Sequence, residues 1–467
     1  MSTGEESGTQ DIGVTPAASV TIDGLAAGGR GVGRREGRVW FVDRSFPGDE
    51  VLAIPERARP RFVEARCGEV LHASPERRSA ACRFHDRCGG CPWMPIPESS
   101  QRNWKKRIVE DALSRIGGLR DLPVEAVRSP GGPLGYRNRV ELTLAASPAP
   151  GRPIVGFHGD AGELVDIDRC LLQAEPANRV LSTIRDHITR RAGELRPDHG
   201  PFRLTIRRSD LTGEILVAIR EDERRFPEAE ALARRILQEH PVVVGVVRVR
   251  ARVGRRGGAH LETVAGRAWI DEQVADLRVR LPADSFVQVS AAGAQELSEL
   301  VVAMSGDLSG QSVLDLYGGV GLYGFALARR GARAVQICEA DLAAVRAGRR
   351  AARRDDAVEF VHDQVGRFLS RERPRSNIVV ANPPRTGMGR IAPRLPATGA
   401  RALILVSCEP ATLARDIASI LRRSDYRVTR VVPVDLFPQT AQIEVVALLE
   451  RGGGSDVGKR AAGDGGQ

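Results

Sequence analysis

Short apolar runs interrupted by glycine and proline mark the first part of the chain. Between Val20 and about Ser79 these runs are VTIDGL, GRVWFV, EVLAIP and FVEARCGEVL. Runs rich in β-branched and aromatic residues and bounded by turn residues are typical of strands. The segment therefore predicts a small β-barrel, and small barrels of this kind often bind nucleic acid on one face.

A helical pattern follows in the segment QRNWKKRIVEDALSRIGGL. Its apolar residues recur at every fourth position, and two glycines close it. This spacing predicts one apolar face of an amphipathic helix, and glycine is common just beyond a helix end. The residues predicted to form the apolar face are Trp104, Ile108, Ala112 and Ile116.

The pattern changes again near residue 286. From about 124 to 285, runs such as RNRVELTLA, EILVAIR and VVVGVVRVRA predict a mostly β central domain, with one helix at 226–239. Beyond 286, the strand-like runs SVLDLY, AVQIC, VEFV, NIVVA and LILVSC are separated by helical stretches. This alternation predicts a parallel, doubly wound sheet. The expected fold class is therefore α/β plus β.

Length and composition indicate a multidomain globular chain. Its 467 residues suggest two or three domains. With a mean hydropathy of −0.22 and no apolar run of about 18 residues, we expect no membrane partner. The start, MSTGEESGTQDIGVTPA, lacks the basic-then-apolar order of a secretory signal, so we expect a cytoplasmic protein. Segments 1–17 and 452–467 are small and polar, which predicts disorder.

The chain is strongly basic. Its net charge is +10 and its pI is about 9.8. Cationic side chains that neutralise phosphates release condensed counterions, so this charge favours RNA or DNA as a partner. Nearly all of the positive charge is arginine, which forms good forks with phosphate but can also reflect genomic base composition. Charge alone leaves both explanations open.

Cysteine spacing predicts a metal site. Seven cysteines in a long chain without a secretory signal favour metal binding or catalysis over a disulfide scaffold. Cys82, Cys88 and Cys91 form C-x5-C-x2-C, and Cys170 lies further along the central domain. Four thiolates can hold a tetrahedral zinc ion or an iron–sulfur cluster. The spacing alone does not choose between them.

A glycine turn follows the first strand of the C-terminal region. In DLYGGVGLYG, Asp315 to Gly324, glycines allow the backbone to pass close to a cofactor, and Glu339 at the end of the next strand can accept ribose hydroxyls. This arrangement suits S-adenosylmethionine or a dinucleotide. The alternative is a simple tight turn between strand and helix.

Two later strands end in candidate chemical groups. NPPRTG, Asn382 to Gly387, follows the strand NIVVA at the edge where open α/β sheets bind ligands. Cys408 ends the strand LILVS just before Pro410 and a predicted helix, whose N-terminus favours the thiolate nucleophile. The alternatives are a small buried cysteine and, for Glu444 near the start of the last strand, an ordinary surface carboxylate.

In this order, the motifs resemble those of the RNA uracil-5-methyltransferase family, which includes 23S ribosomal RNA and transfer-RNA enzymes. The resemblance covers about 18–451. It implies an N-terminal OB-like TRAM barrel, a central domain and a Rossmann-like class I methyltransferase domain. The expected limits are 18–79 for the barrel, 80–98 with 124–285 for the central domain, and 99–123 with 286–451 for the methyltransferase domain.

The resemblance also implies cofactors and site residues. Cys82, Cys88, Cys91 and Cys170 match the pattern of the iron–sulfur members, which implies a [4Fe-4S] cluster. Cys408 matches the catalytic cysteine and Glu444 the late glutamate. The S-adenosylmethionine site is expected to include Gln288, Tyr317, Glu339 and Asn382, with Asp363 as a weaker addition. The RNA-contacting residues are expected to be Tyr136, Arg137, Arg139 and Phe286, which lies two residues before Gln288.

The chain departs from the family pattern at several positions. The usual aspartate of Asp-Pro-Pro-Arg is Asn382 here, and Leu322 occupies a position that is often polar. Glu409 replaces a frequent asparagine, while Gln439 and Gln442 replace frequent histidines. Changes at 382 and 322 put cofactor binding in doubt, but the nucleophile and the proposed base remain.

The resemblance implies methylation of uridine carbon 5 in RNA, with S-adenosylmethionine as donor and a covalent bond from Cys408 to carbon 6. The cluster cysteines favour ribosomal over transfer RNA, and we expect a monomer. One alternative is a nitrogen methyltransferase, because NPPR is similar to the Asn-Pro-Pro-aromatic loops that hold amino groups, although position 385 is arginine. Another is a non-catalytic RNA-binding relative.

Overall fold

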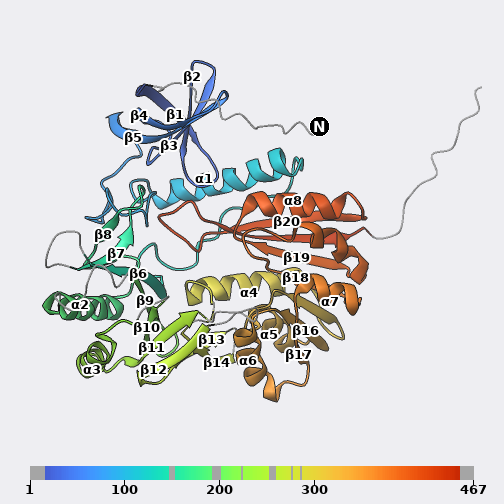
Figure 1. The fold of residues 1–467 in the computed structure, drawn as a ribbon. Helices are drawn as coiled ribbons and strands as arrows, with labels where there is room; N and C mark the ends of the chain where they lie inside the picture. The colour runs from blue at the N-terminus through green and yellow to red at the C-terminus, as the bar shows by residue number, and fades with distance from the viewer. Residues whose placement is uncertain are drawn as a thin grey trace, which may run out of the picture.

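The computed structural model describes residues 16–146, 153–191, 201–221, 225–251, 259–274, 277–283, 285 and 287–452. Figure 1 shows a small barrel above α1, a central sheet beside α2 and α3, and a C-terminal sheet flanked by helices. Apart from 16, 17 and 452, the segments predicted to be disordered lie outside the described residues. No helix in the described ranges is long and apolar enough to cross a membrane.

The N-terminal strands close into a barrel in the order β1-β2-β3-β5-β4. Alternate side chains, such as those of Val20, Ile22, Trp40 and Val42, point into its core, because successive residues of a strand face opposite sides. The predicted small barrel is confirmed. Its strands are β1 (Ala18–Leu25), β2 (Gly31–Arg35), β3 (Arg38–Asp43), β4 (Glu50–Ala58) and β5 (Phe62–His72).

The central sheet has the order β12-β11-β10-β9-β6-β7-β8. Apolar side chains of α2 (Glu175–Arg190) and α3 (Ala229–Glu239) pack against it in one core. The predicted helix begins at Ala229 rather than 226, and α2 was not predicted. The strands are β6 (Arg139–Ala145), β7 (Ile154–His158), β8 (Leu164–Asp166), β9 (Phe202–Arg208), β10 (Ile215–Glu221), β11 (Val243–Ala251) and β12 (Ala259–Gly266). A hairpin of β13 (Trp269–Val274) and β14 (Leu277–Pro282) follows.

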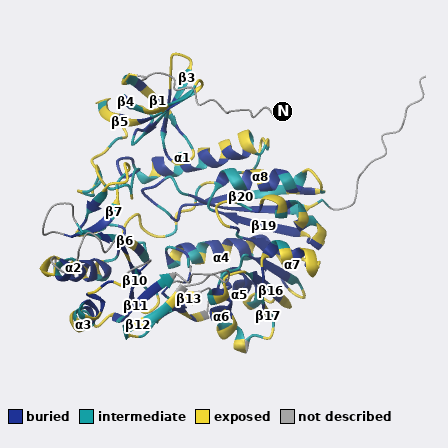
Figure 2. Cartoon of the chain, in the orientation of Figure 1, coloured by how far each residue is buried: buried dark blue, intermediate teal, exposed yellow. Residues whose placement is uncertain are grey.

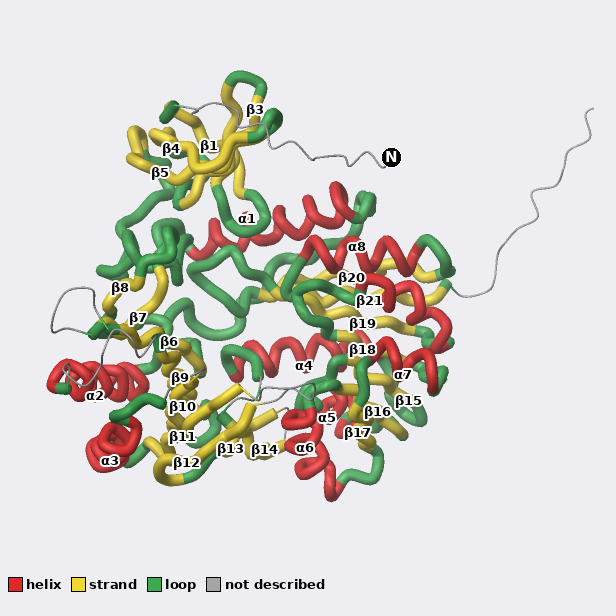
Figure 3. Tube along the Cα trace, in the orientation of Figure 1, coloured by secondary structure: helices red, strands yellow, loops and turns green. Residues whose placement is uncertain are grey.

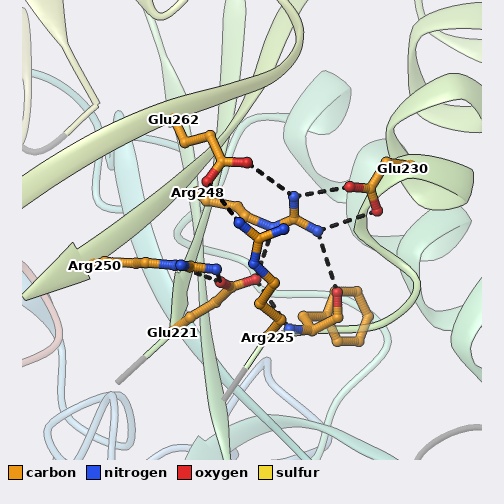
Figure 4. A network of polar contacts seen from close by, with 7 residues as sticks. Glu221, Arg225, Glu230, Arg248, Arg250 and Glu262 are labelled. Atoms are coloured by element: carbon orange, nitrogen blue, oxygen red, sulfur yellow. Dashed lines mark hydrogen bonds and ion pairs between the residues drawn. The ribbon is translucent and has the colours of Figure 1, made fainter. Parts of the chain in front are cut away.

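A buried ion network joins the central sheet to α3 (Figure 4). Arg248 on β11, with only 3% of its side chain exposed, donates to Glu221 at 2.9 Å and to Glu230 at 2.8 Å. Arg250 donates to the other Glu221 oxygen at 2.9 Å, and Glu262 lies 3.4 Å from Arg248. Each buried charge therefore faces an opposite charge, which offsets the cost of removing it from water.

The C-terminal sheet has the order β17-β16-β15-β18-β19-β21-β20. Strands β15 to β19 run parallel, as predicted, but β21 runs antiparallel to both β19 and β20. The parallel arrangement is therefore confirmed for the five strands from which it was predicted. Strands β20 and β21, whose direction was not predicted, add an antiparallel edge and are joined without a crossover helix. The strands are β15 (Ser312–Leu316), β16 (Ala334–Glu339), β17 (Val358–His362), β18 (Ile378–Ala381), β19 (Ala402–Ser407), β20 (Tyr426–Val434) and β21 (Glu444–Arg451).

Helices cover both faces of this sheet (Figure 3). Apolar residues of α7 and α8 share a core with Val109 and Leu113, and those of α4, α5 and α6 belong to a core on the other face. Figure 2 shows the strands between them as buried, and every residue of β18 and β19 is buried. The helices are α4 (Ala291–Ser305), α5 (Leu322–Arg329), α6 (Leu342–Ala351), α7 (Val365–Arg371) and α8 (Pro410–Leu421), with a 3-10 segment at Gly389–Thr398.

Helix α1 (Glu98–Asp111) ties the cysteine-rich segment to the C-terminal sheet. Lys105 on α1 is fully buried and lies 2.5 Å from Asp435, just after β20. The last turn, Ala112–Ile116, widens into a π-helix. This change of pitch moves Ile116, which is 54% exposed, off the apolar face, so its predicted burial is wrong.

Candidate active site

The ends of β15, β18 and β19 meet at one edge of the C-terminal sheet. Leu316 pairs with Ala381, and Ala381 pairs with Leu405. Because these strands are parallel, the residues that follow them, Tyr317, Asn382 and Cys408, emerge at the same edge. This is the edge at which open α/β sheets bind their ligands.

The antiparallel strand β21 adds Glu444 to that edge. Ser407 at the end of β19 pairs with Val445 near the start of β21. A parallel last strand would end here instead of starting here. The reversal of β21 thus brings Glu444 beside Cys408, two residues that are far apart in the sequence.

A cavity beside the glycine turn contains most of the predicted cofactor residues. Gln288, Tyr317 and Asn382 line it, together with Gly318 and Gly319. Tyr317 has a left-handed backbone, with φ of 61°, and its N–H donates to the Cys338 carbonyl at 2.9 Å. Asn138, Leu322 and Tyr323 complete part of the wall.

Two acidic residues hold the glycine turn from within. One Glu339 oxygen accepts the Gly319 N–H at 2.9 Å, and the other accepts the N–H groups of Ala340 and Asp341. Asp315 is fully buried and accepts the Gly324 N–H at 2.9 Å, and burial raises its pKa to about 7. Glu339 thus contacts the turn but does not line the cavity, so its predicted ribose contact stays a prediction.

Asp363 is turned toward α7. Its side chain accepts the Gln364 N–H at 2.8 Å and lies 3.3 Å from Arg367 and 3.5 Å from Arg371. Its Oδ2 atom has no hydrogen-bond partner among the described residues, so its predicted role at the cofactor site stays a prediction.

Cys408 lies in a second cavity, of about 500 Å³, at the junction of all three parts of the chain. The barrel contributes Ala27 and Gly28 to the wall, and the cysteine-rich segment contributes Gly89 and Gly90. Gly29 is packed so closely that a Cβ there would lie 2.7 Å from that of Ala441. The barrel loop is therefore a wall of this cavity.

Burial and two neighbouring charged side chains act in opposite directions on the pKa of the Cys408 thiol. Burial raises its pKa, Glu444 raises it further when its carboxyl is ionised, and the Arg385 guanidinium lowers it. Burial is the largest of these effects, so the pKa of Cys408 lies above its usual value and the group is a thiol at neutral pH in the free protein. Of the neighbouring charges, Arg385 is the one that favours the thiolate.

Glu444 is buried, with 5% of its surface exposed. Among the described residues, its Oε2 atom has no hydrogen-bond partner. Burial raises its pKa to about 8, and Arg385 acts in the opposite direction. The carboxyl is therefore mostly protonated at pH 7 and ionises near pH 8.

Arg385 and Tyr323 are site residues that the sequence prediction did not include. Arg385 sits on the NPPRTG loop, which α8 fixes in place: Arg415 donates to the Thr386 carbonyl at 2.8 Å, and Asp416 accepts the Met388 N–H at 2.6 Å. Its place two residues after Pro383, in the loop that follows a strand of the ligand-binding edge, could have marked it as a candidate site residue from the sequence. Tyr323 lies within an apolar helical run and carries no comparable signal.

The two glutamines that replace family histidines have different surroundings. Gln439 is buried and left-handed, with φ of 72°; its N–H donates to Gln101 on α1 at 2.8 Å, and its side-chain oxygen accepts from Gln101 at 3.0 Å. Gln442 lines the cavity that contains Cys408. Gln439 thus anchors the segment before β21 to α1. Glu409 is the N-cap residue of α8.

One cavity of about 500 Å³ is lined by all four cysteines that are predicted to bind a cluster, Cys82, Cys88, Cys91 and Cys170. Burial and the neighbouring Cys170 and Cys88 raise the pKa of Cys91 to about 12. No three cysteine, histidine or acidic side chains in the described part of the chain lie close enough to hold a single metal ion.

The predicted RNA-contacting residues are spread over different surroundings. Arg137 lines both the cysteine cavity and the Cys408 cavity. Tyr136 donates to the Pro438 carbonyl at 3.2 Å, and Arg139 lies 3.5 Å from Glu141. Phe286 lies outside the described residues.

Known proteins resemble this chain over most of its length. Residues 290–403 match the methyltransferase small domain. An uncharacterized RNA methyltransferase of Nitratidesulfovibrio vulgaris is 34% identical, over 92% of this chain and 95% of the relative. The 23S rRNA (uracil(1939)-C(5))-methyltransferase of Pseudomonas putida is 30% identical, over 95% of this chain and 96% of the relative. The chain belongs to the RNA uracil-5-methyltransferase family. It is thus an RNA methyltransferase.

The fold of this RNA methyltransferase is also seen in a solved structure. The crystal structure of the Pyrococcus abyssi tRNA (uracil-54, C5)-methyltransferase in complex with S-adenosyl-L-homocysteine superimposes with a TM-score of 0.69 and 24% identity. The match covers 92% of this chain and all of that one. The methyltransferase therefore shares its barrel, central and C-terminal arrangement with a known enzyme.

Proposed function

We propose that this enzyme methylates carbon 5 of a uridine in RNA, with S-adenosylmethionine as donor and Cys408 as a covalent nucleophile. One observation carries the proposal: a cysteine and a buried carboxyl meet at the ligand-binding edge of the sheet, with Arg385 acting on both. Carbon 5 chemistry uses both groups, whereas methylation of a nitrogen leaves them without a task.

The steps follow from the chemistry of uracil. Carbon 5 is too weak a nucleophile to attack a sulfonium methyl group unaided. The Cys408 thiolate adds to carbon 6, and the electrons of the carbon 5–carbon 6 double bond form an enolate. Carbon 5 then takes the methyl group, and S-adenosylhomocysteine leaves. Glu444 removes the carbon 5 proton, the double bond re-forms, and Cys408 departs as the thiolate.

Arg385 is the electrostatic centre of this proposal. Both Cys408 and Glu444 need to lose a proton before they act, and burial opposes both losses. The guanidinium lowers the cost of each negative charge in turn. In this proposal, S-adenosylmethionine binds in the cavity lined by Gln288, Tyr317 and Asn382, with Glu339 at the glycine turn.

Ribosomal RNA is the substrate that we propose. The Pseudomonas putida relative is named for 23S rRNA. The four cluster cysteines also favour ribosomal RNA through the resemblance described above. The archaeal structural neighbour is named for tRNA, which makes tRNA the second candidate. The base is turned out of its stack, with Phe286 as a stacking partner and Tyr136, Arg137 and Arg139 near the RNA. We propose a monomeric, cytoplasmic enzyme with the domain limits given above.

A [4Fe-4S] cluster is proposed for the cysteine cavity. The four thiols are a suitable donor set, and all four line one cavity of about 500 Å³. The resemblance to the iron–sulfur members of the family is what favours a cluster over a zinc ion. Cys82, Cys88, Cys91 and Cys170 would hold the cluster, which would supply no step of the reaction and would stabilise the central domain and shape the RNA site. A cysteine variant without the cluster that folds normally and binds RNA with unchanged affinity would contradict this role.

The test is a methyl-transfer assay with product analysis. Purified enzyme, methyl-labelled S-adenosylmethionine and unmodified ribosomal or transfer RNA are incubated, and the RNA is digested to nucleosides. We expect label in 5-methyluridine from ribosomal RNA. Label in an N-methylated nucleoside, or in no nucleoside from either RNA, contradicts the proposed function.

A further inference from the structure

The cavity beside the glycine turn, where we place the cofactor, has one charged side chain in its wall among the residues described, that of Glu272. Glu272 lies on β13, in the hairpin that follows the central sheet, and is buried. The rest of the wall consists of apolar side chains, glycines and neutral polar groups such as Gln288 and Asn382. The family aspartate at position 382 is an asparagine here, so the carboxylate of this cavity comes from Glu272 instead.

The hairpin holds Glu272 on a face that is otherwise apolar. Successive residues of a strand point to opposite sides, so Glu272 shares a face with Ile270. Val279 pairs with Glu272 across the hairpin, and Ile270 and Val279 belong to one apolar core with Val320 of the glycine turn. A charged group on such a face costs free energy unless it is paired or hydrogen-bonded, so the partners of this carboxylate matter.

Backbone N–H groups satisfy most of the Glu272 carboxylate. Those of Leu211 and Gln273 donate to one oxygen at 3.2 and 2.9 Å, and that of Asp210 donates to the other at 3.0 Å. Burial raises the pKa of Glu272, and these N–H groups act in the opposite direction. A carboxylate offers about four acceptor sites, so its second oxygen can still accept from a ligand.

The cavity continues beyond Glu272. The part beside the glycine turn measures about 80 Å³, whereas ligand pockets usually have about 300–1,000 Å³. A second cavity, of about 330 Å³, shares Glu272, Gln273, Ala291 and Ala294 with the first, while Asn382 lines only the first. Glu272 therefore lies where the two cavities meet, at the end away from Asn382.

The charges of S-adenosylmethionine match this arrangement. The cofactor carries a sulfonium, an α-ammonium group and one carboxylate. The methyl group on its sulfur has to face the sheet edge at which Cys408 and Asn382 follow neighbouring strands. Because Glu272 lies at the other end of the cavity, the α-ammonium is the positive group that it can bind.

We propose that the Glu272 carboxylate binds the α-ammonium group of S-adenosylmethionine. This inference rests on the cofactor of the proposed function and adds to its site a residue from outside the C-terminal sheet. It also explains how a chain without the family aspartate at position 382 keeps a negative charge in the cavity.

The test is ligand binding to the full-length protein without RNA, measured by isothermal titration calorimetry. In Glu272→Gln the side chain keeps its size and loses its charge. S-adenosylmethionine and S-adenosylhomocysteine share the α-ammonium, so we expect both dissociation constants to rise about ten- to hundredfold, the usual effect of one hydrogen bond between charged groups. 5′-Methylthioadenosine has no amino-acid part, so its dissociation constant should be unchanged.

A change in the ligand tests the same contact from the other side. The ligand is an S-adenosylhomocysteine analogue with a hydroxyl in place of the α-amino group. We expect it to bind the wild type about ten- to hundredfold more weakly than S-adenosylhomocysteine does. In Glu272→Gln the two ligands should bind equally, because the contact that distinguishes them is already gone.

Asp271→Asn is the matched control. Asp271 is the neighbouring residue of β13, lines neither cavity and pairs with Arg278 at 2.9 Å. This substitution also removes one negative charge from β13, but from its opposite face. Its dissociation constants for all the ligands should equal those of the wild type.

The outcomes separate this inference from the proposed function. If the wild type binds no S-adenosylmethionine, the proposed function fails. If it binds the cofactor and makes 5-methyluridine, but Glu272→Gln binds equally well, only this inference is refuted. Equal weakening of 5′-methylthioadenosine would mean that the variant damages the whole cavity. Weaker binding of S-adenosylmethionine but not of S-adenosylhomocysteine would assign Glu272 to the sulfonium. Either result overturns the assignment to the α-ammonium.

Discussion

Glu221 and Glu444 are both buried carboxyls, in two different regions, and their surroundings are opposite. Glu221, in the central sheet, is 1% exposed and accepts from Arg248, from Arg250 and from the Phe226 N–H. Glu444, at the edge of the C-terminal sheet, has an oxygen with no partner in the part of the chain that is described. In the central sheet both oxygens of the buried carboxylate accept hydrogen bonds, whereas at the edge of the C-terminal sheet one oxygen of Glu444 accepts none from the described residues.

The comparison shows that a buried carboxyl can serve either the stability of the fold or the chemistry of an active site. A buried ion pair with every group bonded holds elements together, and removal of one partner is expensive because a charge is stranded. A buried acid without partners avoids that cost by keeping its proton, as the raised pKa of Glu444 shows. Such an acid can take part in proton transfer near neutral pH.

The largest expected effect is on methyl transfer at the edge of the C-terminal sheet. Cys408→Ala should lower methyl transfer by at least about 10³-fold, because no other group replaces the nucleophile. Its thermal unfolding should match that of the wild type, since the thiol is not part of a paired network. Measurable turnover within tenfold of wild type would remove Cys408 from the mechanism.

Glu444→Gln is the next largest. The amide keeps the shape but cannot accept a proton, so turnover should fall by about 10²–10⁴-fold, the usual worth of a general base. Covalent RNA adduct should accumulate on unmodified uridine RNA, as seen by denaturing gel electrophoresis. Loss of activity without adduct would place Glu444 before methyl transfer instead of after it.

Arg248→Met tests the structural side. It removes one of the two guanidinium partners of the buried Glu221, so the free energy of unfolding should drop by up to about 3–5 kcal/mol, measured by denaturant titration. Activity per folded molecule should stay near wild type. Arg278→Met is the control: Arg278 is 65% exposed and pairs with Asp271 at 2.9 Å, so its loss should cost no more than about 1 kcal/mol. Equal losses for both variants would contradict the comparison.

The smallest effect is on pH dependence. Under the proposed mechanism the rate should rise with pH up to about 8, where Glu444 ionises.

The same pKa also affects stability. A folded pKa above the usual value near 4.5 means that the folded state holds a proton that the unfolded state has released. Glu444 therefore lowers stability as pH rises from about 4.5 to 8. Glu444→Gln should gain stability relative to wild type across this window, in thermal melts at several pH values. A constant difference would contradict the raised pKa.

Much of the site follows from strand order alone. The runs before Tyr317, Asn382 and Cys408 are apolar and strand-like, and parallel neighbours bring their ends together. The position of Glu444 did not follow, because the direction of β21 depends on its pairing with β19 and β20. Tyr323 was also missed, since its polar atom lies in a run whose pattern is that of core.

Two errors of the sequence prediction have different causes. Helix α2 was overlooked although its buried residues Val180, Leu181, Ile184 and Ile188 recur at helical spacing, so its local pattern agrees with its packing against the central sheet. Ile116 fits the four-residue spacing, yet the π-turn moves it into solvent. The barrel was predicted correctly, because its runs alternate clearly and its turns are rich in glycine.

The central claim is a covalent bond from Cys408 to the target uracil. The direct measurement is to incubate the enzyme with S-adenosylmethionine and RNA containing 5-fluorouridine, whose fluorine cannot leave as a proton does. We predict a denaturation-stable adduct, with the modified peptide containing Cys408 and the joined nucleotide identifying the target. No adduct with either ribosomal or transfer RNA, from enzyme that is folded and active on ordinary RNA, would contradict the covalent mechanism.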